Sequence, residues 1–167
     1  MTRLRRIEDR DRFFFITTNL SRSQRIWDPS ERDIILNCVN ALRDSGAFWL
    51  FAYVVMPDHV HVLMRPNHRN LVEAMREFKI DAAKLILRDR GARGPLWQRQ
   101  YFDRIIRRVR DFWEKVEYIH NNPAAAGLVA RADDWHWSSY LAYINGAGPP
   151  PIPVDEINLS VDGGTVL

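Results

Sequence analysis

The sequence has few of the residues that build disulfide frameworks, metal–thiolate sites or membrane spans. Its 167 residues include one cysteine, Cys38, which excludes an internal disulfide and a zinc site built on cysteines. No segment approaches the roughly 20 apolar residues of a membrane helix, so no membrane partner is expected. The charged start of the chain, MTRLRRIEDRDR, is unlike a signal peptide, and we therefore expect a reducing cytoplasm as the location.

Lysine is also scarce. The chain has 24 Lys and Arg residues against 21 Asp and Glu, and only Lys79, Lys84 and Lys115 are lysine. The net charge of +3 is modest, but arginine binds phosphate with two parallel hydrogen bonds and stacks on bases. The composition therefore favours a nucleic-acid partner. The codon bias of a GC-rich genome would also enrich arginine, and composition alone does not separate these two explanations.

The hydrophobic pattern predicts the element order β-α-β-β-α-β, followed by helices. The predicted strands are 13–20, 48–56, 59–65 and, with a less regular pattern, 96–106. The predicted helices run from Pro29 to Gly46, over 70–90 and over 111–122, with an end near Pro123 and a short final helix within 133–144. This order is typical of the α+β ferredoxin-like split βαβ fold, a four-stranded antiparallel sheet with two helices on one face. The C-terminal helices would then carry Tyr118.

The length of the chain fits a single domain with a short appendage. Its composition changes at Gly146, where a segment rich in proline and glycine begins. We therefore predict a domain over 1–145 and a C-terminal tail over 146–167 that is extended, disordered or docked on the domain.

Two histidines lie within the apolar segment VVMPDHVHVLMRP. Side chains alternate along a strand, so His59 and His61 share one face, about 7 Å apart along the strand. Two imidazoles in this arrangement can bind one metal ion. They are too few for a structural zinc site, which has about four protein ligands, so a third ligand and open positions for substrate would be needed. The alternative is a pair of satisfied polar residues on a half-exposed strand.

A second polar cluster lies in EKVEYIHNNPAAAGLV. Residues four apart share a helix face, so Tyr118 and Asn122 lie together, with Glu114 one turn earlier. The phenol can supply an oxygen nucleophile and the carboxamide a neutral metal ligand. Alternatively, Tyr118 is a core aromatic residue and Asn122 caps the helix before Pro123.

A tyrosine nucleophile needs assistance near neutral pH because the reference pKa of its phenol is about 10. A nearby cation would lower that pKa, and Glu114, Glu117 and His120 are candidate bases. His120 is two residues from Tyr118 and should face elsewhere on the helix. We predict a hydrogen bond from His120 to the adjoining loop.

Three motifs in order, MPDHVHVLM, YIHNNPAAAGLV and WHWSSY, resemble those of the single-tyrosine transposases of the HUH superfamily (His, hydrophobic residue, His). Within that superfamily the chain looks most like the REP-associated tyrosine transposases of bacteria. The resemblance covers about residue 10 to residue 144 and includes WQRQYFDRIIR at 97–107. The chain departs from the common pattern at Asp58, where Asn is usual, and at Ala124, where Val is usual.

The resemblance implies that His59, His61 and Asn122 bind a divalent metal, magnesium or manganese, and that Tyr118 is the catalytic nucleophile. Imidazole ligands by themselves favour manganese or zinc over magnesium. The implied enzyme is a metal-dependent single-strand DNA transesterase, or transposase. It would nick and rejoin DNA beside a hairpin of REP-like palindromes through a 5′-phosphotyrosine intermediate. We expect a monomer rather than a dimer, associated with the bacterial nucleoid.

Other functions make different predictions. The main alternative is a non-cleaving, sequence-specific DNA hairpin-binding protein. An RNA-binding module of ferredoxin-like fold would place aromatic residues, not histidines, at exposed strand centres. A metal hydrolase that activates water would cleave DNA without becoming attached to it.

Arginines flank the motifs and are candidates for phosphate contacts, which would make affinity fall with salt. We predict such contacts for Arg5, Arg6, Arg93, Arg99, Arg104, Arg107 and Arg108. Aromatic residues could stack on unpaired bases, although a core position is the favoured interpretation for Trp97, Tyr101, Trp135 and Trp137. WHWSSY is predicted to pack the last helix against the sheet.

Overall fold

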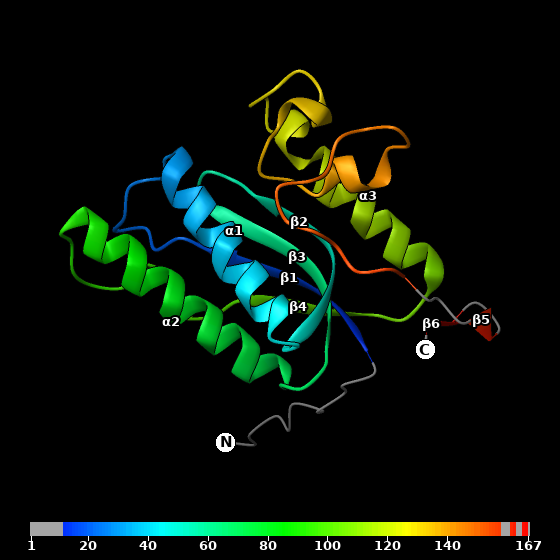
Figure 1. Ribbon diagram of the computed structural model, residues 1–167. Coiled ribbons are helices and arrows are strands. Elements are labelled where there is room, and N and C mark those ends of the chain that lie inside the picture. Colours follow the sequence, from blue (N-terminus) through cyan, green and yellow to red (C-terminus); the bar gives the residue numbers. More distant parts are fainter. Residues whose placement is uncertain (1–11, 158–160, 163–164, 167) are drawn as a thin grey trace.

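Four antiparallel strands form the central sheet, in the order β2-β3-β1-β4 (Figure 1). The computed structural model describes residues 12–157, 161–162 and 165–166. The strands are β1 (Phe13–Asn19), β2 (Phe48–Val55), β3 (His59–Pro66) and β4 (Phe102–Ile106). Helices α1 (Pro29–Asp44) and α2 (Leu71–Arg90) cover one face, and α3 (Val109–Ala125) packs on the other. The predicted ferredoxin-like α+β fold is confirmed.

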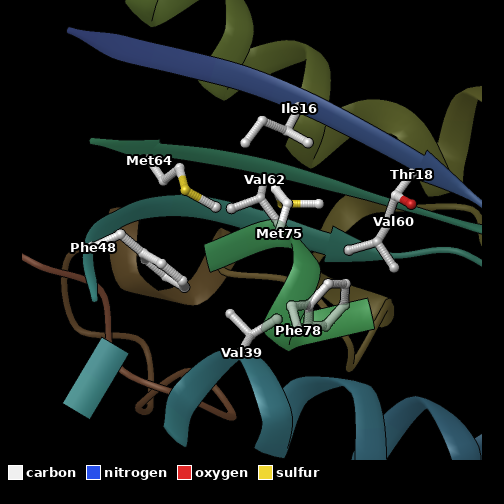
Figure 2. A pocket seen from close by; sticks show the side chains of 9 residues that line it. All are labelled: Ile16, Thr18, Val39, Phe48, Val60, Val62, Met64, Met75 and Phe78. Atoms are coloured by element: carbon white, nitrogen blue, oxygen red, sulfur yellow. The ribbon is translucent and has the colours of Figure 1, made fainter. Parts of the chain in front are cut away.

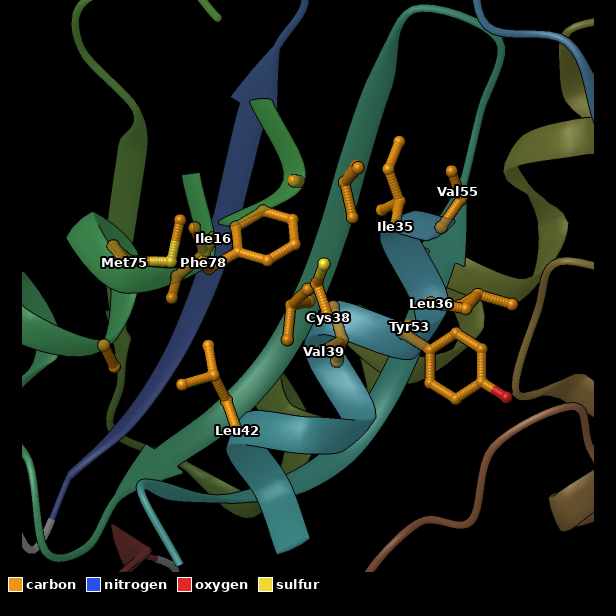
Figure 3. Packing of buried hydrophobic residues seen from close by; sticks show 14 of the residues in the cluster. Ile16, Ile35, Leu36, Cys38, Val39, Leu42, Tyr53, Val55, Met75 and Phe78 are labelled. Atoms are coloured by element: carbon orange, nitrogen blue, oxygen red, sulfur yellow. The ribbon is translucent and has the colours of Figure 1, made fainter. Parts of the chain in front are cut away.

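The alternation of side chains along β1 divides the core between the two faces of the sheet. Phe14 and Ile16 belong to the apolar cluster under α1 and α2, whereas Phe13 and Phe15 belong to the cluster under α3. Figure 3 shows Ile35, Leu36, Val39 and Leu42 of α1 within the first cluster, together with Tyr53 and Val55 of β2. Because both faces of the strand are apolar, β1 is buried between two helical layers.

Local signals fix the ends of the two helices on the first face. Asp28 caps α1, and its side chain and Glu31 accept each other's backbone N–H in a capping box, with Pro29 in the first turn. Asn70 and Glu73 form the same motif at the start of α2. α2 ends at Gly91, whose φ of 59° is in the left-handed region that favours glycine.

Two elements differ in length from the prediction. β4 begins at Phe102 instead of residue 96, because Trp97 is buried against Trp27 and Phe78 and forms only an isolated bridge with Leu20. α3 continues past Pro123 to Ala125. A proline near the end of a helix removes only one N–H donor, and burial of the Pro123 ring favours the helical path.

The predicted final helix within 133–144 is wrong. Two short 3₁₀ turns, η1 (Ala132–Asp134) and η2 (Tyr140–Tyr143), lie at its ends. Between them Ser138 forms an isolated antiparallel bridge with Val54 at the edge of β2, where Val55 N–H donates to the carbonyl of Trp137 at 2.8 Å and Ser139 N–H donates to that of Tyr53 at 3.0 Å. Pairing with the sheet edge replaces the helical hydrogen bonds.

Part of the proline-rich tail docks on the domain. Ile152 is buried, and its carbonyl accepts a hydrogen bond from the Tyr53 hydroxyl at 2.9 Å. Asp155 N–H donates to the carbonyl of Leu50 at 2.7 Å. Farther along, β5 (Val161–Asp162) and β6 (Thr165–Val166) form a two-stranded ribbon. The division into a domain over 1–145 and a tail over 146–167 stays a prediction.

No helix in the described part of the chain is long and apolar enough to cross a membrane.

Candidate active site

The two histidines of β3 lie on the face of the sheet that α3 covers. Their ring centroids are 4.7 Å apart, with the rings inclined at 72°. His61 is buried, with 4% of its surface exposed, whereas His59 is half-buried at the end of the strand. The predicted shared face is confirmed, and it opens toward solvent at His59.

Each imidazole has a hydrogen-bond partner at Nδ1. Thr17 lies directly opposite His61 in the β1–β3 register, and its Oγ1 is 2.8 Å from His61 Nδ1. Asp58 Oδ1 is 2.7 Å from His59 Nδ1. A proton on both Nδ1 atoms leaves each Nε2 with a lone pair for a ligand, the arrangement by which outer partners orient metal-binding histidines.

Burial, together with smaller contributions from the nearby His59 and Lys115, lowers the pKa of the His61 imidazole to about 3. His61 is therefore neutral at physiological pH, as a metal ligand must be.

Helix α3 brings the tyrosine to the histidines. Phe112, Val116 and Ile119 of α3 are buried against the sheet, and this packing leaves Tyr118 beside His61, with ring centroids 5.4 Å apart. The Tyr118 side chain is 47% exposed, so it is not a core aromatic residue. Its ring also lies edge-on to Phe15 at 5.8 Å.

Asn122 faces the same histidine one turn farther along α3. Its Nδ2 is 3.5 Å from His61 Nε2. The oxygen and nitrogen of a carboxamide are assigned from their hydrogen bonds, and a rotation of the amide presents Oδ1 to the same point. The structure thus brings together all four residues that the sequence singled out, from β3 and from α3.

The donors present fit a divalent cation. The described residues contain no group of three or more His, Cys, Asp or Glu side chains that could hold a metal ion. The third donor of the candidate site would therefore be the Asn122 amide. The available set is two imidazole nitrogens and one amide oxygen, with open positions remaining. Such a set suits a catalytic ion that accepts nitrogen ligands, manganese better than magnesium.

Comparison with known proteins identifies the family. The family described as "Transposase IS200 like" matches residues 13–122. The chain belongs to this family. It is 24% identical over 142 residues to the REP-associated tyrosine transposase of Escherichia coli (strain K12), covering 84% of this chain and 83% of that protein. A Haemophilus influenzae protein provisionally given the same name is 29% identical over 110 residues, covering 56% of this chain and 59% of that protein.

A solved structure of a REP-associated tyrosine transposase bound to a REP hairpin has the same fold. It matches with a TM-score of 0.73 at 22% identity and covers 99% of this chain and 97% of that one. The resemblance to the REP-associated tyrosine transposases is confirmed, and the chain is a DNA-processing enzyme of the transposase class.

Two residues near the candidate active site were not among the sequence candidates. Lys115 is half-buried, and its Nζ lies 5.0 Å from the ring centroid of Tyr118 and 4.7 Å from that of Phe15. Its spacing of three residues from Tyr118 could have placed it on the same helix face. Thr17 could be found only from the strand register, which is a non-local property.

The candidate bases occupy different environments. Glu117 lines an open groove on α3 together with Tyr118 and Asn122. Glu114 lines the same groove but forms an ion pair with Arg110 at 3.4 Å. His120 is buried, its Nε2 is 2.8 Å from Ser139 Oγ, and burial lowers its pKa to about 4. His120 therefore has a hydrogen-bond partner, but in the segment before η2 instead of the adjoining loop that the sequence predicts.

The motif WHWSSY packs against β2 as an irregular segment with one isolated bridge, not as a helix. Trp135 Nε1 donates to the carbonyl of Val55 at 3.1 Å, and the Arg32 guanidinium lies over the Trp137 ring at 4.1 Å. The core interpretation is confirmed for the four aromatic residues considered for base stacking: Trp97 and Trp135 are buried, and Tyr101 and Trp137 are partly buried against the core.

The five predicted DNA-binding arginines within the described residues are exposed and form no ion pair there. Arg104 lies on β4, and Arg107 and Arg108 connect β4 to α3. Arg93 and Arg99 lie in the connection between α2 and β4. Arg5 and Arg6 lie outside the described residues.

Proposed function

We propose that this transposase is a single-strand DNA transesterase that nicks and rejoins DNA beside a hairpin through a covalent 5′-phosphotyrosine at Tyr118. The observation that carries the proposal is the half-exposed Tyr118 ring next to His61, with Asn122 at the same histidine. The REP hairpin in the related structure supports hairpin DNA as the partner.

The proposed chemistry uses one nucleophile. The Tyr118 phenolic oxygen attacks the scissile phosphorus, a bond forms between them, and the bond from phosphorus to the 3′ oxygen breaks. The phenolic proton passes to solvent or to Glu117, and the leaving 3′ oxygen takes up a proton. One phosphodiester replaces another, so a second 3′-hydroxyl can attack the phosphotyrosine and rejoin strands without ATP.

The remaining residues bind and orient. His59, His61 and Asn122 would hold a divalent ion, manganese or magnesium, which supplies positive charge to the scissile phosphate as a Lewis acid. The Asp58 carboxylate would keep the proton of His59 on Nδ1, and the Thr17 hydroxyl would orient the His61 ring through its Nδ1. Lys115 adds a positive charge beside the Tyr118 ring.

The decisive experiment uses a labelled DNA hairpin with a single-stranded flank, incubated with the full chain and manganese and analysed on a denaturing gel. We expect a covalent protein–DNA band that Tyr118→Phe abolishes, with DNA binding retained. Tyr140→Phe, at a tyrosine in η2, is the matched control and should leave the band unchanged. A covalent band in Tyr118→Phe would contradict the proposal.

The same gel separates the alternatives. A non-cleaving hairpin-binding protein would shift the DNA on a native gel and form no covalent band. A hydrolase would release a shortened strand with no attached protein.

We propose a monomer that acts on nucleoid DNA in the bacterial cytoplasm, and light scattering of the free protein tests the oligomeric state.

A further inference from the structure

The row of residues that contains His61 continues across the sheet to the edge strand. Thr17 pairs with His61 on one side and with Phe102 of β4 on the other. Directly paired residues project from the same face of a sheet. Neighbouring strands are about 4.8 Å apart, so the backbone of Phe102 lies roughly 10 Å from that of His61, on the face that carries the candidate active site.

Phe102 presents its ring to solvent. Its side chain is 57% exposed, because α3 covers the other end of β4, where Ile106 is buried with Phe13 and Phe112. β4 is also the open edge of the sheet among the described residues, whereas the edge at β2 is covered by the segment around Trp137. The ring is therefore accessible from the side of the candidate active site.

Two cations flank this part of the face. Arg104 is paired with Phe15 in the β1–β4 register, and the Lys115 ammonium lies over the same phenylalanine ring at 4.7 Å. Asp103 pairs with Ile16 and so belongs to the opposite face. The surface between Tyr118 and the β4 edge thus combines an exposed aromatic ring with positive charge, which suits a single-stranded nucleic acid.

We infer that Phe102 is a stacking platform for an unpaired base beside the scissile phosphate, and that Arg104 contacts a phosphate of the same flank. The inference rests on the proposed function, because it places the single-stranded DNA across β1 and β4 from Tyr118. Base–aromatic stacking tolerates any sequence, so this contact holds the strand in position and does not select its sequence.

The test of stacking uses Tyr118→Phe protein, so that the DNA stays intact, and hairpin oligonucleotides with the fluorescent base 2-aminopurine at each flank position in turn. We expect quenching at one position or at two adjacent positions. Phe102→Leu should abolish this quenching and weaken binding about 5- to 150-fold, and Phe102→Trp should retain both. Trp49→Leu is the control, since Trp49 is a 41% exposed aromatic residue on the opposite edge strand.

The phosphate contact is tested by salt titration with the same oligonucleotides. Arg104→Gln should reduce the slope of log affinity against log salt by about 0.7, the value for one phosphate of a single strand. Arg88→Gln removes the same charge from α2, on the other face of the sheet, and should leave the slope unchanged.

Quenching that persists in Phe102→Leu would overturn the inference, and so would a failure of the protein to bind the oligonucleotide. A free protein that is dimeric and becomes monomeric in Phe102→Leu would assign the ring to contact with a second copy instead. Quenching that depends on Phe102, with no covalent band from unmodified protein, would contradict the proposed cleavage and support this inference. A covalent band from unmodified protein, with quenching that does not depend on Phe102, would support the proposed cleavage and contradict this inference.

Discussion

At the scale of single residues, Thr17 is a positioning residue for His61. Its hydroxyl is the partner of His61 Nδ1, and valine has the same shape without the hydrogen bond. Outer partners of this kind typically contribute 10- to 100-fold to metal affinity. We expect Thr17→Val to weaken manganese binding by about that factor, measured by calorimetry on the free protein.

The neighbouring threonine provides the control. Thr18 Oγ1 is buried with no hydrogen-bond partner in the described part of the chain, and Figure 2 shows Thr18 among apolar side chains at a small cavity under α1 and α2. Thr18→Val should leave manganese affinity unchanged and stabilise the fold by about 1 kcal/mol, because a buried unsatisfied hydroxyl is removed. Equal losses of metal affinity in both variants would contradict the role of Thr17.

Much of the candidate site could be predicted at this scale because it depends on local periodicity. The alternation of a strand places His59 and His61 on one face, and a spacing of four along a helix aligns Tyr118 with Asn122. Thr17 and Phe102 could not be found in this way. Their relation to His61 is set by strand register, which joins residues that are distant in the sequence.

At the scale of elements, a buried ion pair joins the start of α1 to the end of α2. Arg90 binds Glu31 with two hydrogen bonds of 2.6 and 2.9 Å, and both side chains are almost fully buried. Removing one partner leaves an uncompensated buried charge. Arg90→Met should lower the free energy of unfolding at pH 7 by about 3 kcal/mol, measured by urea titration. A larger loss is not expected because Arg25 still contacts Glu31. Arg88→Met, in an exposed pair with Asp89, should stay within about 0.5 kcal/mol.

This ion pair also gives the stability a dependence on acid. Burial alone would raise the pKa of Glu31, but the hydrogen bond from Arg90 and that from the Asp28 N–H hold it below its usual value of 4.5. The stabilisation is therefore complete above pH 4.5 and is lost as the pH falls through the lower pKa of the folded state. In Arg90→Met the free energy of unfolding should fall less than in the unmodified protein as the pH is lowered from 7 through the pKa of Glu31. An unchanged acid dependence would contradict the assignment.

Element types followed from the sequence where local signals agreed. The capping residues Asp28 and Asn70 and the left-handed Gly91 mark helix ends that any reader of the pattern can find. The helix predicted within 133–144 is absent because the conformation of this segment depends on β2, a strand about 80 residues earlier in the chain. The segment forms hydrogen bonds with N–H and C=O groups at the edge of β2. Local helical spacing carries no information about such a partner.

At the scale of the whole molecule, the convergence of the site depends on how α3 packs on the sheet. The sequence identified Tyr118 and His61 separately, and the family resemblance joined them. Their distance follows from the aromatic cluster of Phe13, Phe51 and Phe112, which fixes α3 on the face opposite α1 and α2. Periodicity predicts that each element has an apolar face, but it does not determine which two faces meet.

The docked tail is the second feature at this scale, and it too could not be predicted from composition. Asp155 accepts hydrogen bonds from Arg43 at 3.1 and 2.5 Å and from the Leu50 N–H at 2.7 Å, across more than 100 residues of sequence. The tail thereby ties α1 to the start of β2, on the side of the sheet away from the open β4 edge.

We expect Asp155→Ala to lower the free energy of unfolding by about 2–3 kcal/mol, because it leaves the Arg43 guanidinium and the Leu50 N–H without their partner. The Leu50 amide should also exchange its hydrogen faster in native-state hydrogen exchange. Asp155→Asn keeps an acceptor for the Leu50 N–H and should lose less, and Glu156→Ala, at the exposed neighbouring carboxylate, should change neither quantity. Covalent attachment to DNA should persist in all three, since the contacts of Asp155 are with Arg43 of α1 and Leu50 of β2 and not with Tyr118. Unchanged exchange at Leu50 in Asp155→Ala would show that the tail does not hold this edge in solution.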